Sequence, residues 1–174
     1  MTREETMRRY LLGVFVVALL ACALMTTSSY AQQKSLKEQL VGAWTIVSSS
    51  TKMPDGSPAW GANPIGLIIF TDNGRYSSQL MRSDLPKFAS DSRVKGTPEE
   101  YKAVMQGSIS SFGTYTVNEA NKTLTIRYEG STFPNRKGAE DTRPFAIQGD
   151  ELHITNPAPS TGGGTSQLVY RRAK

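Results

Sequence analysis

The chain has almost no cysteine or histidine. It contains one cysteine, Cys22, and one histidine, His153. A single cysteine cannot form an internal disulfide, and one histidine excludes zinc sites built from several histidines. No Gly-x-Ser-x-Gly motif is present, and no lysine follows the glycines at 162–164 as a P-loop requires. The sequence therefore predicts no metal, no cofactor and no catalytic residue that a motif identifies.

Long apolar runs are also scarce, and the single clear one lies near the N-terminus. Arg3, Arg8 and Arg9 precede an apolar stretch at residues 11–25, and small residues at Ser29 and Ala31 follow it. Basic residues, a short apolar run and a small-x-small site are typical of a secretory signal peptide. The run is shorter than the roughly 20 residues of a membrane-spanning helix. We therefore expect residues 1–31 to be a cleaved leader on an exported, periplasmic or secreted protein.

Two other interpretations of the N-terminus remain open. In the first interpretation, the leader is not cleaved and anchors the protein. In the other, Leu19-Leu20-Ala21-Cys22 is a lipobox and Cys22 carries a lipid, although Leu20 is large for that position and Ala23 to Met25 continue the apolar run. Cleavage after Ala31 would remove the cysteine, and we expect the mature protein not to be stably inserted in a membrane.

A strong clustering of positive charge is absent as well. The formal net charge is +5, and removal of a leader with three basic and two acidic residues lowers it to +4. Basic residues are scattered from Lys34 to Lys174, whereas nucleic-acid binding usually needs a clustered basic face. We expect no nucleic-acid partner, and one domain at residues 32–174.

What the sequence does contain is a series of short alternating segments. Apolar and polar residues alternate with period two, which is typical of strands, and turn residues such as Asp72-Asn73-Gly74 separate them. The predicted strands are residues 43–49, 65–70, 75–82, 112–117, 123–130, 143–148, 151–155 and 167–172. Eight short strands predict a mainly β fold, a small closed antiparallel barrel.

One main helix interrupts the strands. Thr97, Pro98 and Glu100 form a capping box with proline at the first helical position. Tyr101, Val104, Met105 and Ile109 follow at helical spacing and predict a packing face. A helical turn is also expected at residues 35–40, before the first strand.

Three stretches together resemble the bacterial and fungal lipocalin-like domain family of the calycin type. They are Leu40 to Trp44 with its Gly-x-Trp, Asn63 to Arg82, and the segments Gly96 to Tyr101, Phe112 to Tyr115 and Glu129 to Asn135. The resemblance implies an antiparallel barrel with an internal cavity for a small, mostly apolar molecule. Family members often carry His before the Phe-Pro-Asn segment and Trp on the last strand; this chain has Ile126, Arg127 and Tyr128 there, and Tyr170.

The resemblance also implies a structural role for Trp44. In lipocalins the Gly-x-Trp tryptophan closes one barrel end and stacks under an arginine of the last strand. Arg171 or Arg172 is the candidate here, and Arg171 is taken as the structural partner.

A set of strand residues is the candidate ligand site. If the less apolar strand faces turn inward, one cavity is lined by Ser77, Gln79, Met81, Tyr115, Arg127, Glu129, Phe133 and Asn135. If those faces turn outward, the same residues are solvated and the site assignment does not hold.

Three functions are compatible with these patterns. The leading one is binding of a small hydrophobic or amphipathic molecule with one polar end. The second is a barrel enzyme of the isomerase or cyclase type that uses Glu129 or Tyr115 as acid or base. The third is a structural or interaction domain without a ligand.

The leader interpretation predicts the N-terminus of the mature protein. N-terminal sequencing of the exported product should begin at Gln32, because signal peptidase cleaves after a small-x-small site. A lipidated Cys22 or an intact leader would contradict it.

Overall fold

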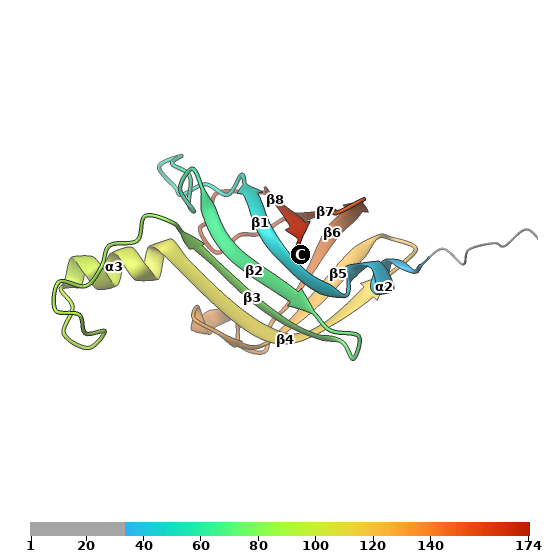
Figure 1. Cartoon of the computed structure of the whole chain (residues 1–174), viewed down its shortest axis with the longest axis horizontal. Coiled ribbons are helices and arrows are strands. Elements are labelled where there is room, and N and C mark those ends of the chain that lie inside the picture. Colours follow the sequence, from blue (N-terminus) through green and yellow to red (C-terminus); the bar gives the residue numbers. More distant parts are fainter. Residues whose placement is uncertain (1–33) are drawn as a thin grey trace, which may run out of the picture. The chain divides into compact units, whose positions relative to one another are not determined.

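The computed structural model describes residues Lys34–Lys174, so the predicted leader and Cys22 lie outside the described residues. Eight antiparallel strands pair in chain order, and the last strand pairs with the first to close a barrel (Figure 1). The strands are β1 Gly42–Ser49, β2 Pro64–Phe70, β3 Arg75–Arg82, β4 Ser108–Asn118, β5 Thr123–Ser131, β6 Glu140–Gln148, β7 Glu151–Asn156 and β8 Ser166–Arg172. The predicted closed eight-stranded barrel is confirmed.

Short helices connect or precede the strands. They are α2 Leu36–Leu40, α3 Pro98–Gly107 and the 3-10 turn η2 Pro134–Arg136. Both predicted helix starts are confirmed: Ser35 caps α2 and Thr97 caps α3, each through a reciprocal capping box with a glutamate three residues later. Within residues 34–174, the helices are all too short or too polar to cross a membrane.

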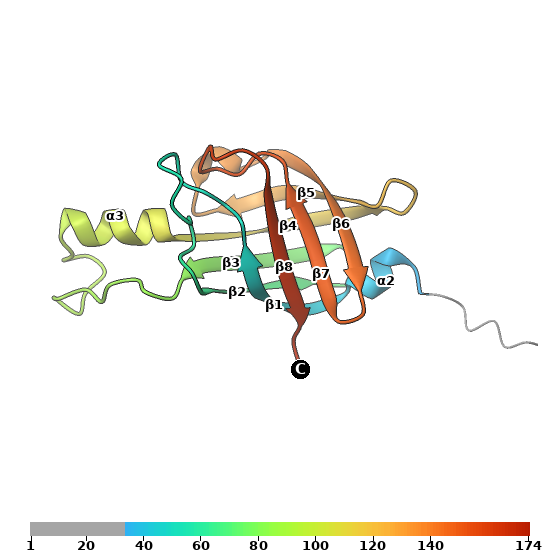
Figure 2. The same ribbon diagram turned by 90° about the horizontal axis from the view of Figure 1, so that it is seen from above.

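The packing face expected on the main helix is corrected by the structure. The helix α3 extends beyond the barrel at the end opposite α2 (Figures 1 and 2). Tyr101 and Met105 are 40% and 54% exposed, and Ile109 already belongs to β4. Tyr101, Val104 and Met105 do lie in the helix, but the helix ends at Gly107 and does not cover the barrel wall.

The two ends of the barrel differ in their connections. At one end, called the closed end, the strands are joined by tight turns at residues 71–74, 119–122 and 149–150, and α2 lies beside them. At the other, the open end, longer connections run through residues 50–63, 83–107, 132–139 and 157–165. Loops that are long and surround an open end are the usual place for binding residues in barrels.

The more apolar face of each strand forms the core. Tyr76 and Leu80 of β3 are 4% and 6% exposed, and Leu124, Ile126 and Tyr128 of β5 are at most 6% exposed. These residues alternate with exposed or half-buried neighbours, because successive side chains of a strand point to opposite faces. Burial of apolar area therefore sets which face of each strand points inward.

Trp44 fills the closed end. Its side chain is fully buried, and its Nε1 donates to the carbonyl of Leu40 at 2.8 Å. The guanidinium of Arg172 lies 4.0 Å from the ring centroid and donates to the carbonyls of Val41 and Gln39. The stacking partner is thus Arg172. Arg171, the partner taken from the sequence, is the wrong one: it is exposed and pairs with Glu151, because neighbouring residues of β8 face opposite ways.

We expect Trp44→Ala to lower the free energy of unfolding by about 3–5 kcal/mol, the usual cost of truncating a fully buried Trp. The substitution leaves a cavity at the closed end and removes the platform of Arg172. Urea unfolding of the purified protein measures the loss. Arg171→Ala is the matched control and should change stability by less than about 1 kcal/mol, since exposed ion pairs contribute little. Equal stability of Trp44→Ala and the wild type would contradict the structural role.

Candidate functional site

The barrel interior contains a small cavity toward the open end. Its volume is about 80 Å³. The apolar part of its wall includes Ile68, Leu80, Ile126, Ile154 and Leu168. The polar part includes Tyr76, Ser78, Ser111, Tyr128, Arg136, Arg143, Asn156 and Tyr170. One small chamber therefore combines an aliphatic wall with two arginines.

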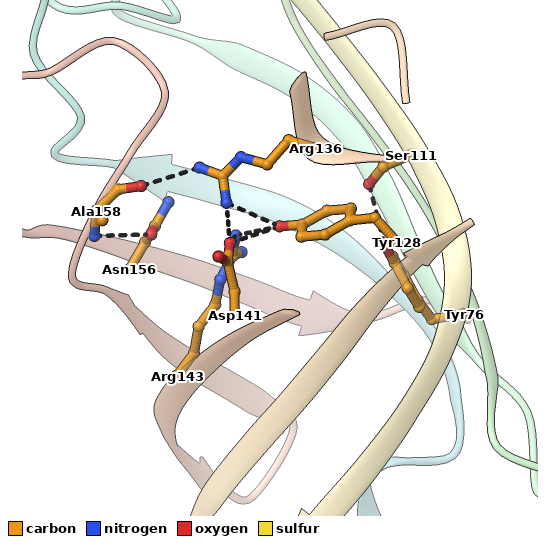
Figure 3. Close-up of polar contacts among 8 residues, drawn as sticks. All are labelled: Tyr76, Ser111, Tyr128, Arg136, Asp141, Arg143, Asn156 and Ala158. Carbon is orange, nitrogen blue, oxygen red and sulfur yellow. Dashed lines mark hydrogen bonds and ion pairs between the residues drawn. The ribbon is translucent and has the colours of Figure 1, made fainter. Parts of the chain in front are cut away.

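A single carboxylate joins the two arginines (Figure 3). Oδ2 of Asp141 accepts hydrogen bonds from the Tyr128 hydroxyl at 2.7 Å, from Nη2 of Arg143 at 2.9 Å and from Nη1 of Arg136. Asp141 and Arg143 are two residues apart on β6, so they share the inward face. Arg136 comes from η2 at the open end. This Arg136–Asp141–Arg143–Tyr128 group is called the arginine cluster below.

Tyr128 connects the arginine cluster to the opposite wall. Its hydroxyl accepts from Nη2 of Arg143 at 2.7 Å and more weakly from Nη1 of Arg136 at 3.4 Å. Its ring meets the ring of Tyr76 edge-to-face, with centroids 6.3 Å apart. The hydroxyl of Tyr76 in turn donates to Ser111 at 3.4 Å. These contacts hold the aromatic rings at fixed positions around the cavity.

The ionisation states follow from this geometry. Burial alone would raise the pKa of Asp141, but the hydrogen bonds from Tyr128 and Arg143 and the two guanidinium charges outweigh burial, and the pKa is lowered. Burial raises the pKa of Tyr128 and that of Tyr170 to about 12. At neutral pH, Asp141 is therefore ionised, both tyrosines are neutral, and the arginine cluster carries one net positive charge.

A second, wider pocket adjoins the cavity at the open end and is called the mouth pocket. It has a volume of about 250 Å³, and Trp60, Ile109 and Ser160 line both spaces. Met53, Met105 and Phe133 add apolar surface to its wall. Arg136 also donates to the carbonyl of Ala158 at 2.9 Å, which links two of the connections around the mouth (Figure 3).

The structure corrects the inward orientation expected for the less apolar strand faces. The side chains of Arg127 and Glu129 are 65% and 41% exposed, while Tyr128 between them is buried. Glu129 forms a two-pronged ion pair with Arg75 on the outer surface, at 2.7 Å on each side. The strand β5 therefore turns the opposite face inward from the one expected. It buries the stripe with the larger apolar area, which contains Tyr128, and leaves Arg127 and Glu129 outside.

The other predicted site residues do not line the cavity either. Ser77, Gln79 and Met81 share the outer face of β3, where Gln79 donates to Ser77 at 2.8 Å. Tyr115 points inward but lies at the closed end, where it packs on Phe70 and donates to the carbonyl of Thr71. Asn135 is exposed in η2. Phe133 alone of the eight reaches the site region, as part of the mouth pocket.

Sequence reasoning missed the arginine cluster. The strand β6 begins at Glu140, three residues before the predicted strand, and so includes Asp141. A signal was present: Arg143 alternates in phase with Phe145 and Ile147, so it occupies the apolar face of its own strand. A charge at such a position must be paired, and Asp141 at the next position of the same face is its partner.

Metal binding has no support in the described part of the chain. No group of three or more His, Cys, Asp or Glu side chains comes together there to hold an ion. Asp141 is instead committed to two arginines and a tyrosine.

The pairing of Asp141 predicts a pH-dependent contribution to stability. We expect Asp141→Asn to lower the free energy of unfolding by about 3 kcal/mol at neutral pH, the low end for a broken buried pair, because the carboxylate is 22% exposed. The folded-state pKa lies below the ordinary value of 3.8, so the contribution is present above about pH 4 and is lost as the pH falls further.

Urea unfolding at several pH values measures this contribution. The difference between wild type and Asp141→Asn should narrow below about pH 4. Glu129→Gln, which breaks an exposed ion pair with Arg75, is the control and should cost less than about 1 kcal/mol. A difference between wild type and Asp141→Asn that stays constant with pH would show that the carboxylate is not held ionised by the arginines.

Comparison with known proteins agrees with this architecture. The family model of the lipocalin-like domain matches residues 41–173, which include all eight strands. No curated protein and no solved structure gives a significant match to the chain. The fold and the match together lead to one conclusion: the chain belongs to the lipocalin-like domain family.

Proposed function

We propose that the barrel binds a small amphipathic molecule, with its polar end in the cavity and its apolar body toward the mouth pocket. The observation that carries this proposal is the division of the cavity wall. Aliphatic residues such as Ile126 and Leu168 line one part, and the arginine cluster lines another. Ligand pockets are commonly apolar with a few fixed polar groups that orient the ligand.

The sizes of the two spaces support this orientation. A cavity of about 150 Å³ is enough to hold a molecule such as benzene, and the barrel cavity is smaller, at about 80 Å³. It therefore suits a polar head group with few carbons. The rest of the molecule fits the mouth pocket of about 250 Å³, which Trp60 and Ile109 connect to the cavity.

The enzyme alternative gains no support from the positions of its two candidate residues. Glu129 is held by Arg75 on the outer surface, and the hydroxyl of Tyr115 is bonded to Thr71 at the closed end. Inside the cavity, burial raises the pKa of Tyr128 to about 12, and its hydroxyl donates a hydrogen bond to Asp141. A general acid or base works best with a pKa near the working pH.

We also propose that the barrel acts after export. The support is the pattern of residues 1–31, with its basic start, short apolar run and small residues at Ser29 and Ala31. A binding barrel without an internal disulfide tolerates an oxidising compartment without depending on it.

Two neighbouring serines on β3 test the binding proposal. Ser78 lines the cavity, whereas Ser77 lies on the outer face. We expect Ser78→Leu to weaken binding of medium-chain alkyl amphiphiles at least about tenfold, because the added carbons occupy the small cavity. Ser77→Leu, the matched control, should bind as the wild type does.

Tryptophan fluorescence provides the measurement. The described chain contains two tryptophans: Trp60 lines both spaces, and Trp44 is buried at the closed end. Ligand titration should change the emission of the wild type and of Trp44→Phe but not of Trp60→Phe. The proposal fails if no amphiphile in a panel of acids, alcohols and amines binds, or if Ser77→Leu and Ser78→Leu behave alike while both remain folded.

A further inference from the structure

The charge of the arginine cluster bears on the chemical class of the ligand. The charged side chains that line the cavity are Arg136 and Arg143, and one carboxylate, Asp141, contacts both of them. Two guanidinium groups and one carboxylate leave one positive charge uncompensated within the cluster. These side chains are only 13–22% exposed, so bulk water screens that charge weakly.

The donors of Arg143 are only partly used. A guanidinium has five N–H donors, and the hydrogen bonds of Arg143 within residues 34–174 all leave from Nη2, toward Asp141 and Tyr128. Its Nε is buried and has no acceptor among the described residues. A buried donor without a partner costs free energy, so an oxygen atom supplied from the cavity would be favourable there.

The two oxygen atoms that join the cluster, the Tyr128 hydroxyl and Oδ2 of Asp141, are already engaged. The Tyr128 hydroxyl directs its hydrogen to Asp141 and accepts from both arginines. Oδ2 of Asp141 accepts three hydrogen bonds. The cluster therefore offers an incoming group unused donors and positive charge, which selects an anion and disfavours a cation.

From these observations we infer that the polar end of the ligand is a carboxylate monoanion that pairs with Arg143. This inference rests on the proposed function. One negative charge equals the uncompensated positive charge of the cluster, and the planar guanidinium matches the planar carboxylate. The cavity of about 80 Å³ accommodates such a flat head group, with the apolar chain passing Ile109 and Trp60 into the mouth pocket.

Three probes of equal chain length test the inference: octanoate, octanol and octylamine. At neutral pH they carry a negative, a neutral and a positive head group. We expect isothermal titration of the purified protein to show octanoate binding at least about tenfold tighter than octanol, and octylamine binding more weakly than either. If octanol or octylamine binds as tightly as octanoate, the inference is wrong while the proposed function stands. If none of the three binds, the proposed function fails as well.

Variants of Arg143 locate the preference. Arg143→Gln removes the charge and should reduce the preference for octanoate over octanol to about twofold or less. Arg143→Lys keeps the charge without the planar donor fork and should give an intermediate preference. Arg127→Gln, on the outer face with its side chain 65% exposed, is the matched control and should keep the wild-type preference. If both Arg143 variants keep the full preference for octanoate, the assignment of the carboxylate to Arg143 is wrong. If Arg143→Gln does not fold, the comparison of the three probes on the wild type still decides the class of ligand.

Discussion

Each strand of this barrel has two faces, and only one of them can be buried. In β3 the buried face carries Tyr76 and Leu80, and in β5 it carries Leu124, Ile126 and Tyr128. Turning these faces outward would expose large apolar side chains and bring Arg127 and Glu129 into the interior, away from water. Both changes cost free energy, so the orientation of every strand is tightly constrained. The position of the cavity and the identity of its lining residues depend on this constraint.

The arginine cluster is an exception to the rule that inward-facing strand positions carry apolar side chains. Arg143 occupies an inward position of β6, where an unpaired charge would cost several kcal/mol. Asp141, two residues earlier, lies on the same face and bonds to it, and Arg136 joins them from η2. Because two positive arginines share one negative carboxylate, the pairing stabilises the cluster but leaves it with a positive charge. A group that is costly for folding is thereby retained next to the cavity, which is typical of binding sites.

The barrel places its aromatic packing and its cavity at opposite ends of its axis. At the closed end, Trp44 donates to the carbonyl of Leu40 and stacks on Arg172, and Phe70 meets Tyr115 edge-to-face with the ring centroids 5.0 Å apart. At the open end lie the cavity, the mouth pocket and the longer connections, including α3 with its exposed Tyr101 and Met105. Changes in the open-end loops therefore affect the site without removing the aromatic packing that closes the other end.

The amino-acid sequence by itself determined the strands, the turns between them and the capping box at Thr97, because these features depend on residues close together in the chain or on a period-two pattern that local chemistry imposes. The closing role of Trp44 was implied by the resemblance to the family. The apolar stripes of the sequence also mark the faces of β3 and β5 that turn inward, but the sequence did not determine whether Arg171 or Arg172 covers Trp44, or that Arg136 meets Asp141. Those outcomes depend on closure of the barrel, which brings distant strands into one register and weighs the burial of all faces together. The tertiary structure alone completed the candidate site, because Arg136 of η2 and Tyr128 of β5 meet Asp141 of β6 only inside the closed barrel.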